Sequence, residues 1–109
     1  EHLPFEEFSR AISEIHRVSK KYAVISVPHF GPPFKLSFKI PFLKEFFISF
    51  RLPLYHPKHK FNGQHYWEMG KRGFSPKLIR NKISEKFNIL KEFIPYENQY
   101  HHFFVLEKK

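Results

Sequence analysis

Hydrophobic residues near the start of the chain recur every three or four positions, with charged residues between them. The apolar positions are Phe5, Phe8, Ile12 and Ile15. This spacing is typical of the buried stripe of an amphipathic helix. Proline suits the first turn of a helix, and Pro4 stands there. The pattern predicts a helix from about Pro4 to Ser19.

The next segment, residues 22–28, reads YAVISVP and is almost continuously apolar. A strand that is apolar on both faces is typical of the interior of a sheet covered on both sides. We therefore expect a buried interior strand that ends at Pro28. A helix that leads directly into such a strand is half of a β-α-β crossover, so we expect an earlier strand upstream of Glu1.

Residues 30–61 combine many phenylalanines with prolines and scattered basic residues. Pro41 predicts a short helix that continues to about Phe50. We interpret the region as a lid-like or substrate-side insertion. In one alternative its phenylalanines are core residues that cover the sheet. In another they insert into an anionic membrane surface, with basic side chains near the head groups. These are Lys35, Lys39, Lys44 and Arg51.

The last part of the chain predicts a helix and a hairpin. Asn62-Gly63 is a turn signal. Ser75 followed by Pro76 suits a helix start, and we expect this helix to end near Lys86. Its apolar stripe comprises Leu78, Ile79, Ile83 and Phe87. Two apolar runs, residues 88–96 and 100–108, flank the turn residues 97–99 and predict an antiparallel pair of strands.

The composition limits the number of domains, the chemistry and the partners that this chain can have. The chain has 109 residues, which is enough for the single domain that we expect over residues 1–109. It has no cysteine, which excludes disulfides and thiolate chemistry. Its net charge of +9 is compatible with an anionic membrane or nucleic acid, and also with a role in solubility alone. Lysines interleaved with aromatic residues could form a stacking groove for nucleic acid, but no recognised module motif supports it. We expect a cytoplasmic protein, at the membrane periphery if residues 30–61 contact lipid.

Three segments resemble the C-terminal half of class I, Rossmann-like S-adenosylmethionine-dependent methyltransferases of the type 11-like group. Residues 1–28 (EHLPFEEFSRAISEIHRVSKKYAVISVP) are similar to the family's Glu-His-Leu step, helix and fifth strand. HYWEMGKRGFSPKLI and HHFFVLEKK resemble its tail, where an antiparallel seventh strand ends the chain. The resemblance implies an α/β fold with a mixed sheet of about three strands. These are one helix-linked strand and a C-terminal antiparallel hairpin, with two to three helices.

The glycines depart from the family's pattern. The family holds its cofactor mainly through a Gly-rich turn after the first strand. None of the four glycines here forms a Gly-x-Gly turn after a strand; they are Gly31, Gly63, Gly70 and Gly73. We therefore expect a fragment that lacks the cofactor half, does not bind S-adenosylmethionine alone and is inactive alone. An apolar edge left on strand 22–28 invites pairing with another chain, so we also expect self-association.

The resemblance implies positions for site residues. Glu1 and His2 stand at the edge of the cofactor site. His65, Trp67 and Glu68 lie on a loop expected at the carboxyl end of the sheet, where open α/β folds bind ligands. Trp67 could stack on the methyl acceptor, a small or lipid-like molecule, and His65 or Glu68 could accept a proton. The catalytic residue itself is not assigned.

These candidates have structural alternatives. Trp67 could pack under the lid, and Glu68 could pair with Lys71 or Arg72. His56 and His59 could join His65 on a metal, but Pro57 interrupts the spacing and no carboxylate joins in, so we predict no metal site. His101 and His102 alternate on a strand and are expected at the surface. The alternative to an enzyme is a basic, Phe-rich module that binds anionic membrane or a partner chain.

Overall fold

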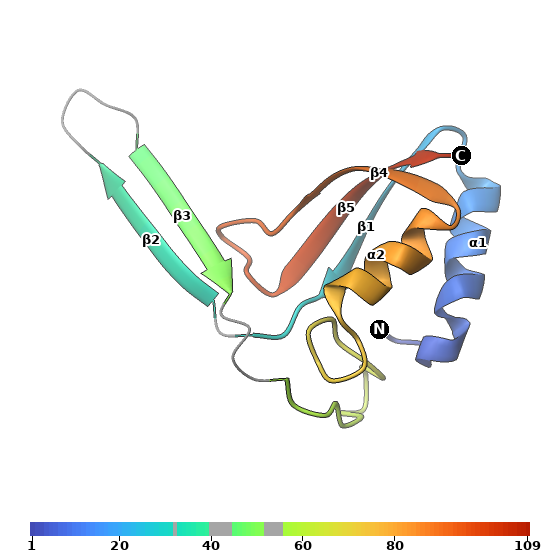
Figure 1. Cartoon of the computed structure of the whole chain (residues 1–109), viewed down its shortest axis with the longest axis horizontal. Coiled ribbons are helices and arrows are strands. Elements are labelled where there is room, and N and C mark those ends of the chain that lie inside the picture. Colours follow the sequence, from blue (N-terminus) through green and yellow to red (C-terminus); the bar gives the residue numbers. More distant parts are fainter. Residues whose placement is uncertain (32, 40–44, 52–55) are drawn as a thin grey trace.

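The structure, a computed structural model, describes residues 1–31, 33–39, 45–51 and 56–109. A single 3-10 turn, η1 (Phe5–Glu7), opens the fold. It is followed by α1 (Phe8–Val18), β1 (Tyr22–Pro28), β2 (Pro33–Lys39), β3 (Glu45–Arg51), α2 (Pro76–Ser84), β4 (Phe87–Phe93) and β5 (His101–Lys108). β1, β5 and β4 form one sheet in that spatial order, and β2 pairs with β3 in a second sheet (Figure 1). The coarse prediction of a small α/β fold is confirmed.

The three-stranded sheet has the last strand of the chain at its centre. β5 runs antiparallel to β1, from Tyr22 opposite Glu107 to Pro28 opposite His101. It also runs antiparallel to β4, with a register shift between Ile89 and Lys91. The predicted C-terminal hairpin is therefore confirmed. The prediction of a mixed sheet is wrong for these three strands. β1 and β4 run in the same direction, but β5 lies between them, so both strand pairings are antiparallel.

Both helices cover one face of this sheet (Figure 1). Burial alternates along β5, so that His102, Phe104 and Leu106 lie on the buried face. The predicted stripe of the first helix is confirmed, since Phe8 and Ile12 are buried and Phe5 and Ile15 pack against the core. The buried core comprises Phe8, Ile12, Val27, Trp67, Met69, Ile79, Ile83, Phe87, Phe104 and Leu106.

The open edge predicted for strand 22–28 is present among the described residues, whereas the predicted burial of both faces of this strand is wrong. β1 lies at the end of its sheet, and β5 is its one strand partner among the described residues. Tyr22 and Val24 remain 55% and 63% exposed. The reason is that the helices cover a single face, so alternate residues of an apolar strand face outward. An open edge with an apolar outer face remains.

The predicted helix over residues 41–50 is also wrong where it can be compared. Residues 45–51 form β3, and residues 41–44 lie outside the described ranges. The pairing register explains the preference for a strand, because every second pair of the ladder joins two apolar residues. These pairs are Phe34 with Phe50, Leu36 with Ile48, and Phe38 with Phe46. The β2–β3 hairpin extends away from the three-stranded sheet (Figure 1).

The second helix begins as its capping sequence predicts. The Ser75 hydroxyl accepts a hydrogen bond from the Leu78 N–H at 3.2 Å, and Pro76 occupies the first turn. The helix ends at Ser84 rather than near Lys86, and the fully buried Phe87 begins β4 instead of continuing the helical stripe. Among the described residues, no helix has the length and hydrophobicity needed to cross a bilayer.

Candidate functional site

Residues 65–71 form a loop at the carboxyl end of β1. Backbone hydrogen bonds fix this loop: Met69 N–H donates to Pro28 O at 3.0 Å, and Phe30 N–H donates to Met69 O at 2.7 Å. Gly70 follows with φ +90°, and a Cβ at that position would lie 2.7 Å from the Phe30 carbonyl oxygen. Only glycine permits this close approach. The loop is therefore held at the carboxyl end of β1.

The start of the chain lies against the same loop. Tyr66 N–H donates to Glu1 O at 2.8 Å. The His2 ring meets the His65 ring edge-on, with centroids 5.0 Å apart, and His2 Nε2 lies 3.5 Å from Glu1 Oε1. Two sets of candidates that are far apart in the sequence, residues 1–2 and 65–68, are thus brought together.

The backbone of His65 is fixed by a local turn. Asn62 Oδ1 accepts from the N–H groups of Gln64 and His65, at 3.1 and 2.8 Å. Gly63 has φ +92° in this turn, which confirms the turn predicted at Asn62-Gly63. His59 Nε2 lies 2.7 Å from the His65 carbonyl oxygen, to which it donates. The His65 ring therefore projects from an anchored segment.

We call Glu1, His2, His65 and Glu68 the polar cluster, and Glu68 is its buried acidic residue. It is 7% exposed, and its Oε1 accepts a hydrogen bond from the Tyr100 hydroxyl at 2.9 Å. His65 Nδ1 lies 3.5 Å from the same oxygen, and Lys71 Nζ lies 4.0 Å from Oε2. Burial, with a contribution from the Glu68 carboxylate, raises the pKa of Tyr100 to about 12. The Tyr100 phenol therefore remains a hydrogen-bond donor to Glu68 at neutral pH.

Trp67 points away from this cluster and into the core. It is 1% exposed and meets the Phe5 and Phe8 rings edge-on, at centroid distances of 5.2 and 5.3 Å. Trp67 is therefore a packed core residue, held among the described residues by the rings of Phe5 and Phe8 rather than by contacts with the lid that the alternative named. Its predicted stacking on an acceptor stays a prediction, since the side chain also borders the pocket described next.

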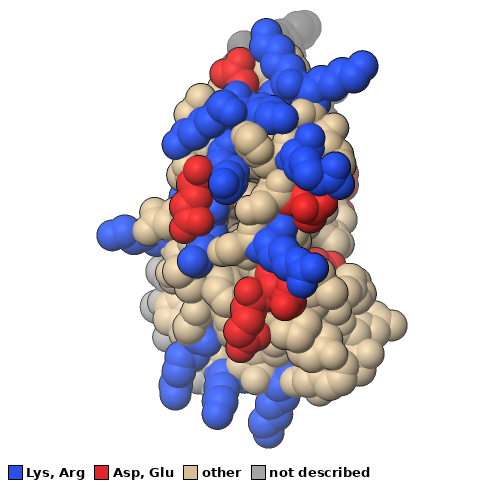
Figure 2. Space-filling view, turned by 90° about the vertical axis from the view of Figure 1, so that its right-hand side faces the viewer, with Lys and Arg blue, Asp and Glu red and all other residues tan. Residues whose placement is uncertain are grey.

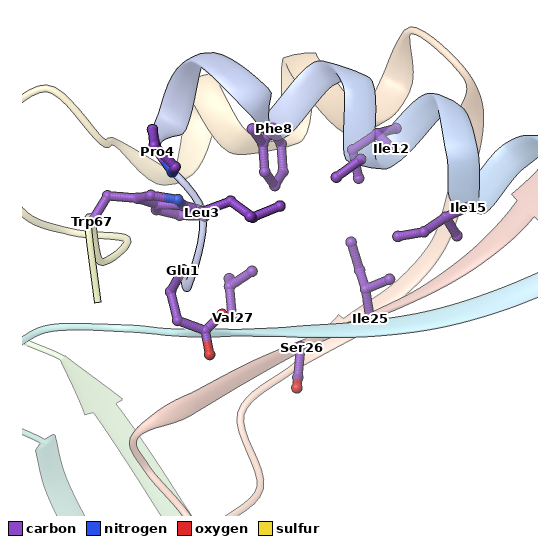
Figure 3. A pocket seen from close by; sticks show the side chains of 11 residues that line it. Glu1, Leu3, Pro4, Phe8, Ile12, Ile15, Ile25, Ser26, Val27 and Trp67 are labelled. Atoms are coloured by element: carbon purple, nitrogen blue, oxygen red, sulfur yellow. The ribbon is translucent and has the colours of Figure 1, made fainter. Parts of the chain in front are cut away.

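An apolar pocket of about 300 Å³ lies between α1 and β1. Figure 3 shows Phe8 and Ile12 of α1 facing Ile25 and Val27 of β1 across it, with Trp67 at one end. Glu1 borders the pocket as well as the polar cluster. The remaining lining residues are Leu3, Pro4, Ala11, Ile15 and Ser26. Among Glu1, His2, His65 and Glu68, Glu1 is the residue that lines this apolar space between α1 and β1.

No family model, curated protein or solved structure matches the chain. The chemistry of the site therefore rests on its geometry. His65 and Glu68 can accept or hold a proton, Tyr100 can donate a hydrogen bond, and Lys71 supplies a positive charge. Such a set can bind and orient a polar molecule whose apolar part enters the pocket.

A second polar network lies at the same end of the sheet. Arg80 donates to both carboxylate oxygens of Glu92 at 2.6–2.9 Å, and Glu92 Oε1 lies 3.0 Å from His102 Nε2. His102 Nδ1 in turn lies 3.1 Å from His29 Nδ1. A carboxylate only accepts, so His102 Nε2 donates to it, and a neutral His102 then accepts from His29. The hydrogen bonds from Arg80 hold the pKa of Glu92 below its ordinary value.

The expectation that His102 lies at the surface is wrong, because this side chain is 6% exposed. Its neighbour His101 lies on the opposite face of β5, as the predicted alternation requires. A signal for the network was present in the sequence. His102 shares the inward face of the strand with Phe104 and Leu106, and a buried histidine needs hydrogen-bond partners.

Three side chains of the polar cluster could hold a cation. Glu1, His2 and His65 each offer one ligand atom, and the three atoms lie within 4.8 Å of one another. The other histidines considered from the sequence are engaged elsewhere: His56 Nδ1 lies 3.0 Å from Gly70 O, and His59 contacts the carbonyl of His65. The predicted absence of a metal site remains a prediction.

Proposed function

We propose that this chain forms the C-terminal part of a class I S-adenosylmethionine-dependent methyltransferase domain whose methyl acceptor is not identified. The strand arrangement supports the proposal. β1 and β4 run in the same direction, and β5, the last strand in the chain, is antiparallel to both. The resemblance of the sequence implies a last strand of this kind. The helix that precedes β1 and the helix that precedes β4 also occur in the implied order.

The polar cluster is the observation that carries the proposal. Glu1, His2, His65 and Glu68 converge at the carboxyl end of β1, although two of them are at the start of the chain and two lie beyond residue 60. Ligands of open α/β sheets bind at this end of the strands. The resemblance implies cofactor contacts for Glu1 and His2, and the position of the loop favours acceptor contacts for His65, Trp67 and Glu68.

The open edge of β1 and the apolar pocket beside it fit a further strand in the complete domain. A preceding parallel strand would pair with that edge and cover the apolar residues between α1 and β1. The described residues alone do not fit the whole cofactor. The backbone at Gly70 already lies against Phe30, where an added Cβ would be 2.7 Å from the Phe30 carbonyl oxygen, so this glycine does not offer its backbone to a cofactor. When bound to the complete domain, the cofactor would supply the methyl group, while this part would orient the acceptor.

The test begins with the size of the native protein in an extract of its own source. We expect a species about twice 13.3 kDa or larger, near the usual size of a complete Rossmann-type domain. That protein should bind S-adenosylmethionine in a calorimetric titration and transfer a labelled methyl group, and the 109-residue chain alone should do neither. A longer native protein that does not bind S-adenosylmethionine would refute the proposal, as would transfer by the short chain alone.

A second candidate function rests on the β2–β3 hairpin. Three of its residue pairs are wholly apolar, and it projects from the rest of the molecule (Figure 1). Lys35, Lys39 and Arg51 belong to the alternate pairs of the same ladder. Such a basic and apolar element suits the surface of an anionic membrane.

Figure 2 shows a different pattern on the helix side, where acidic side chains lie among the basic ones. Three of the ion pairs there are Glu7–Arg10, Glu14–Arg17 and Lys82–Glu85. Co-sedimentation with anionic and neutral vesicles tests the hairpin's role. The membrane function predicts binding to anionic vesicles alone, lost at high salt. Absence of binding to anionic vesicles would refute the membrane function of the hairpin.

A further inference from the structure

We propose that Glu1, His2 and His65 form a binding site for a divalent transition-metal ion, with Zn²⁺ as the probe. Two imidazoles and one carboxylate are an established ligand set for zinc and its neighbours among the transition metals. The three ligand atoms lie within 4.8 Å of one another. A tetrahedral ion with bonds of about 2.1 Å keeps its ligand atoms about 3.4 Å apart. Side-chain rotation would have to close the remaining gap, and the His2 side chain is exposed.

The backbone holds the two segments in position before any ion binds. The hydrogen bond from Tyr66 N–H to Glu1 O fixes residue 1 against the loop. Asn62 and His59 fix the backbone on either side of the His65 ring. Preorganisation matters because ordering long side chains and a chain end costs conformational entropy. Here the fold has already ordered the backbone of both segments before the ion binds.

The surroundings of His65 resemble the outer shell of a metal site. A metal-bound histidine usually donates its second ring nitrogen to a carboxylate, which fixes the ring and its tautomer. His65 Nδ1 lies 3.5 Å from Glu68 Oε1 and 3.3 Å from the Tyr100 hydroxyl. Glu68 is buried and is itself held by Tyr100. With Nδ1 directed at Glu68, Nε2 of His65 is the nitrogen left for the metal.

Three protein ligands would leave a coordination position for an external group. Sites of this type keep an open position, whereas structural zinc sites are closed by four protein ligands. Glu1 also borders the apolar pocket between α1 and β1. A molecule with an apolar body in that pocket could place an oxygen or nitrogen on the metal. Metal binding itself does not depend on the methyltransferase proposal, so the two can fail separately.

Calorimetric titration of the metal-free 109-residue chain with ZnCl₂ tests the site. We expect saturable binding of one equivalent, which is lost in the His2→Ala and His65→Ala variants. Glu68→Gln should retain binding but weaken it by about 10- to 100-fold, the usual effect of removing an outer-shell partner. The matched control is His16→Ala. His16 lies near the C-terminal end of α1, where its Nε2 contacts Lys109 O, away from the cluster.

His2→Ala is the decisive variant because the His2 side chain is 63% exposed and its removal should not unfold the chain. Circular dichroism checks that each variant retains its helices. Absence of saturable binding by the parent chain would overturn the proposal. Undiminished binding by His2→Ala, or loss of binding by His16→Ala with the fold intact, would also overturn it.

Discussion

Replacement of Glu92 by glutamine isolates the contribution of the network that joins α2, β4 and β5. The Arg80 Nε–H is shared between the two carboxylate oxygens, at 2.7 and 2.9 Å, and Arg80 Nη2 donates to Oε1 at 2.6 Å. It also lies 3.0 Å from His102 Nε2. Glutamine keeps one acceptor oxygen in nearly the same volume but removes the charge.

The size of the effect follows from the difference between charged and neutral hydrogen bonds. A hydrogen bond to a charged group contributes about 1.5–3 kcal/mol and a neutral one about 0.5–1.5 kcal/mol, so the bond from His102 weakens by roughly 1 kcal/mol. Arg80 remains charged and loses the attraction of the carboxylate charge. Solvent screens the part shared with Arg80, whose side chain is 43% exposed. We therefore expect the free energy of unfolding to fall by about 1.5 kcal/mol. Urea denaturation should show a lower midpoint with an unchanged slope.

The effect should depend on pH. The hydrogen bonds from Arg80 lower the pKa of Glu92 in the folded chain below its ordinary value of 4.5. A carboxyl with a depressed folded pKa stabilises the fold above the unfolded pKa, and this stabilisation is lost as the pH falls through the folded pKa. The difference between the parent and Glu92→Gln should therefore be full near neutral pH and shrink below about pH 4.5.

Glu85→Gln is the matched control, because Glu85 pairs with Lys82 at 3.7 Å and its side chain is 55% exposed. Exposed pairs of this kind contribute little, so the control should change stability by less than about 0.5 kcal/mol. Equal effects of the two substitutions would refute the reasoning. A difference that persists unchanged into acid would refute it as well.

Four further predictions follow from other parts of the fold. Ile83→Ala removes a fully buried side chain and should lower stability by about 2–5 kcal/mol in urea denaturation. Gly70→Ala should destabilise the loop by at least about 1–3 kcal/mol, because the new Cβ would need φ +90° and would meet Phe30 O at 2.7 Å. The Tyr100 phenol should titrate near pH 12 in ultraviolet absorbance. The open edge of β1 should support self-association, measured by sedimentation at tens of micromolar.

Each of these has a control or an opposing result. Leu90→Ala should have a small effect, because Leu90 is 53% exposed. Gly63→Ala keeps the positive φ but meets no atom within 4 Å, so its cost should be smaller than that of Gly70→Ala. The change in ultraviolet absorbance near pH 12 should be missing in the Tyr100→Phe variant. Because the folded pKa of Tyr100 is raised, its contribution to stability is present below about pH 10 and is lost as the pH rises through about 12. A strictly monomeric chain would contradict the self-association prediction.

The elements that could be predicted from the sequence are those with one clear periodicity and local boundary signals. The first helix has a stripe at helical spacing, and the second has Ser75 and Pro76 at its start. The β2–β3 hairpin was missed because a short run of Phe, Ile and Ser fits a buried helix and a strand equally well. What decides between them is the pairing of β3 with β2, and that pairing is not visible in either segment alone.

The candidate site was predicted in part. His65 and Glu68 were selected as polar residues on a loop, and Glu1 and His2 through the family resemblance. Their convergence depends on the bond between Tyr66 and Glu1, which joins segments far apart in the chain. Tyr100 was missed because its contact with Glu68 arises only when the end of β5 reaches the loop. Trp67 illustrates the converse, since an aromatic residue beside polar neighbours turned inward to the core.

The central position of β5 has a consequence for how the chain acquires its structure. Tyr22 pairs with Glu107, and β4 also pairs with β5, so neither β1 nor β4 can join this sheet until residues 101–108 have been synthesised. Contacts between such distant positions slow folding, since a long loop must close first. During synthesis the helices and β1 emerge while their central strand has yet to be made. The apolar residues of β1 are then exposed to incorrect partners, and removal of residues 101–108 would remove the central strand of the sheet.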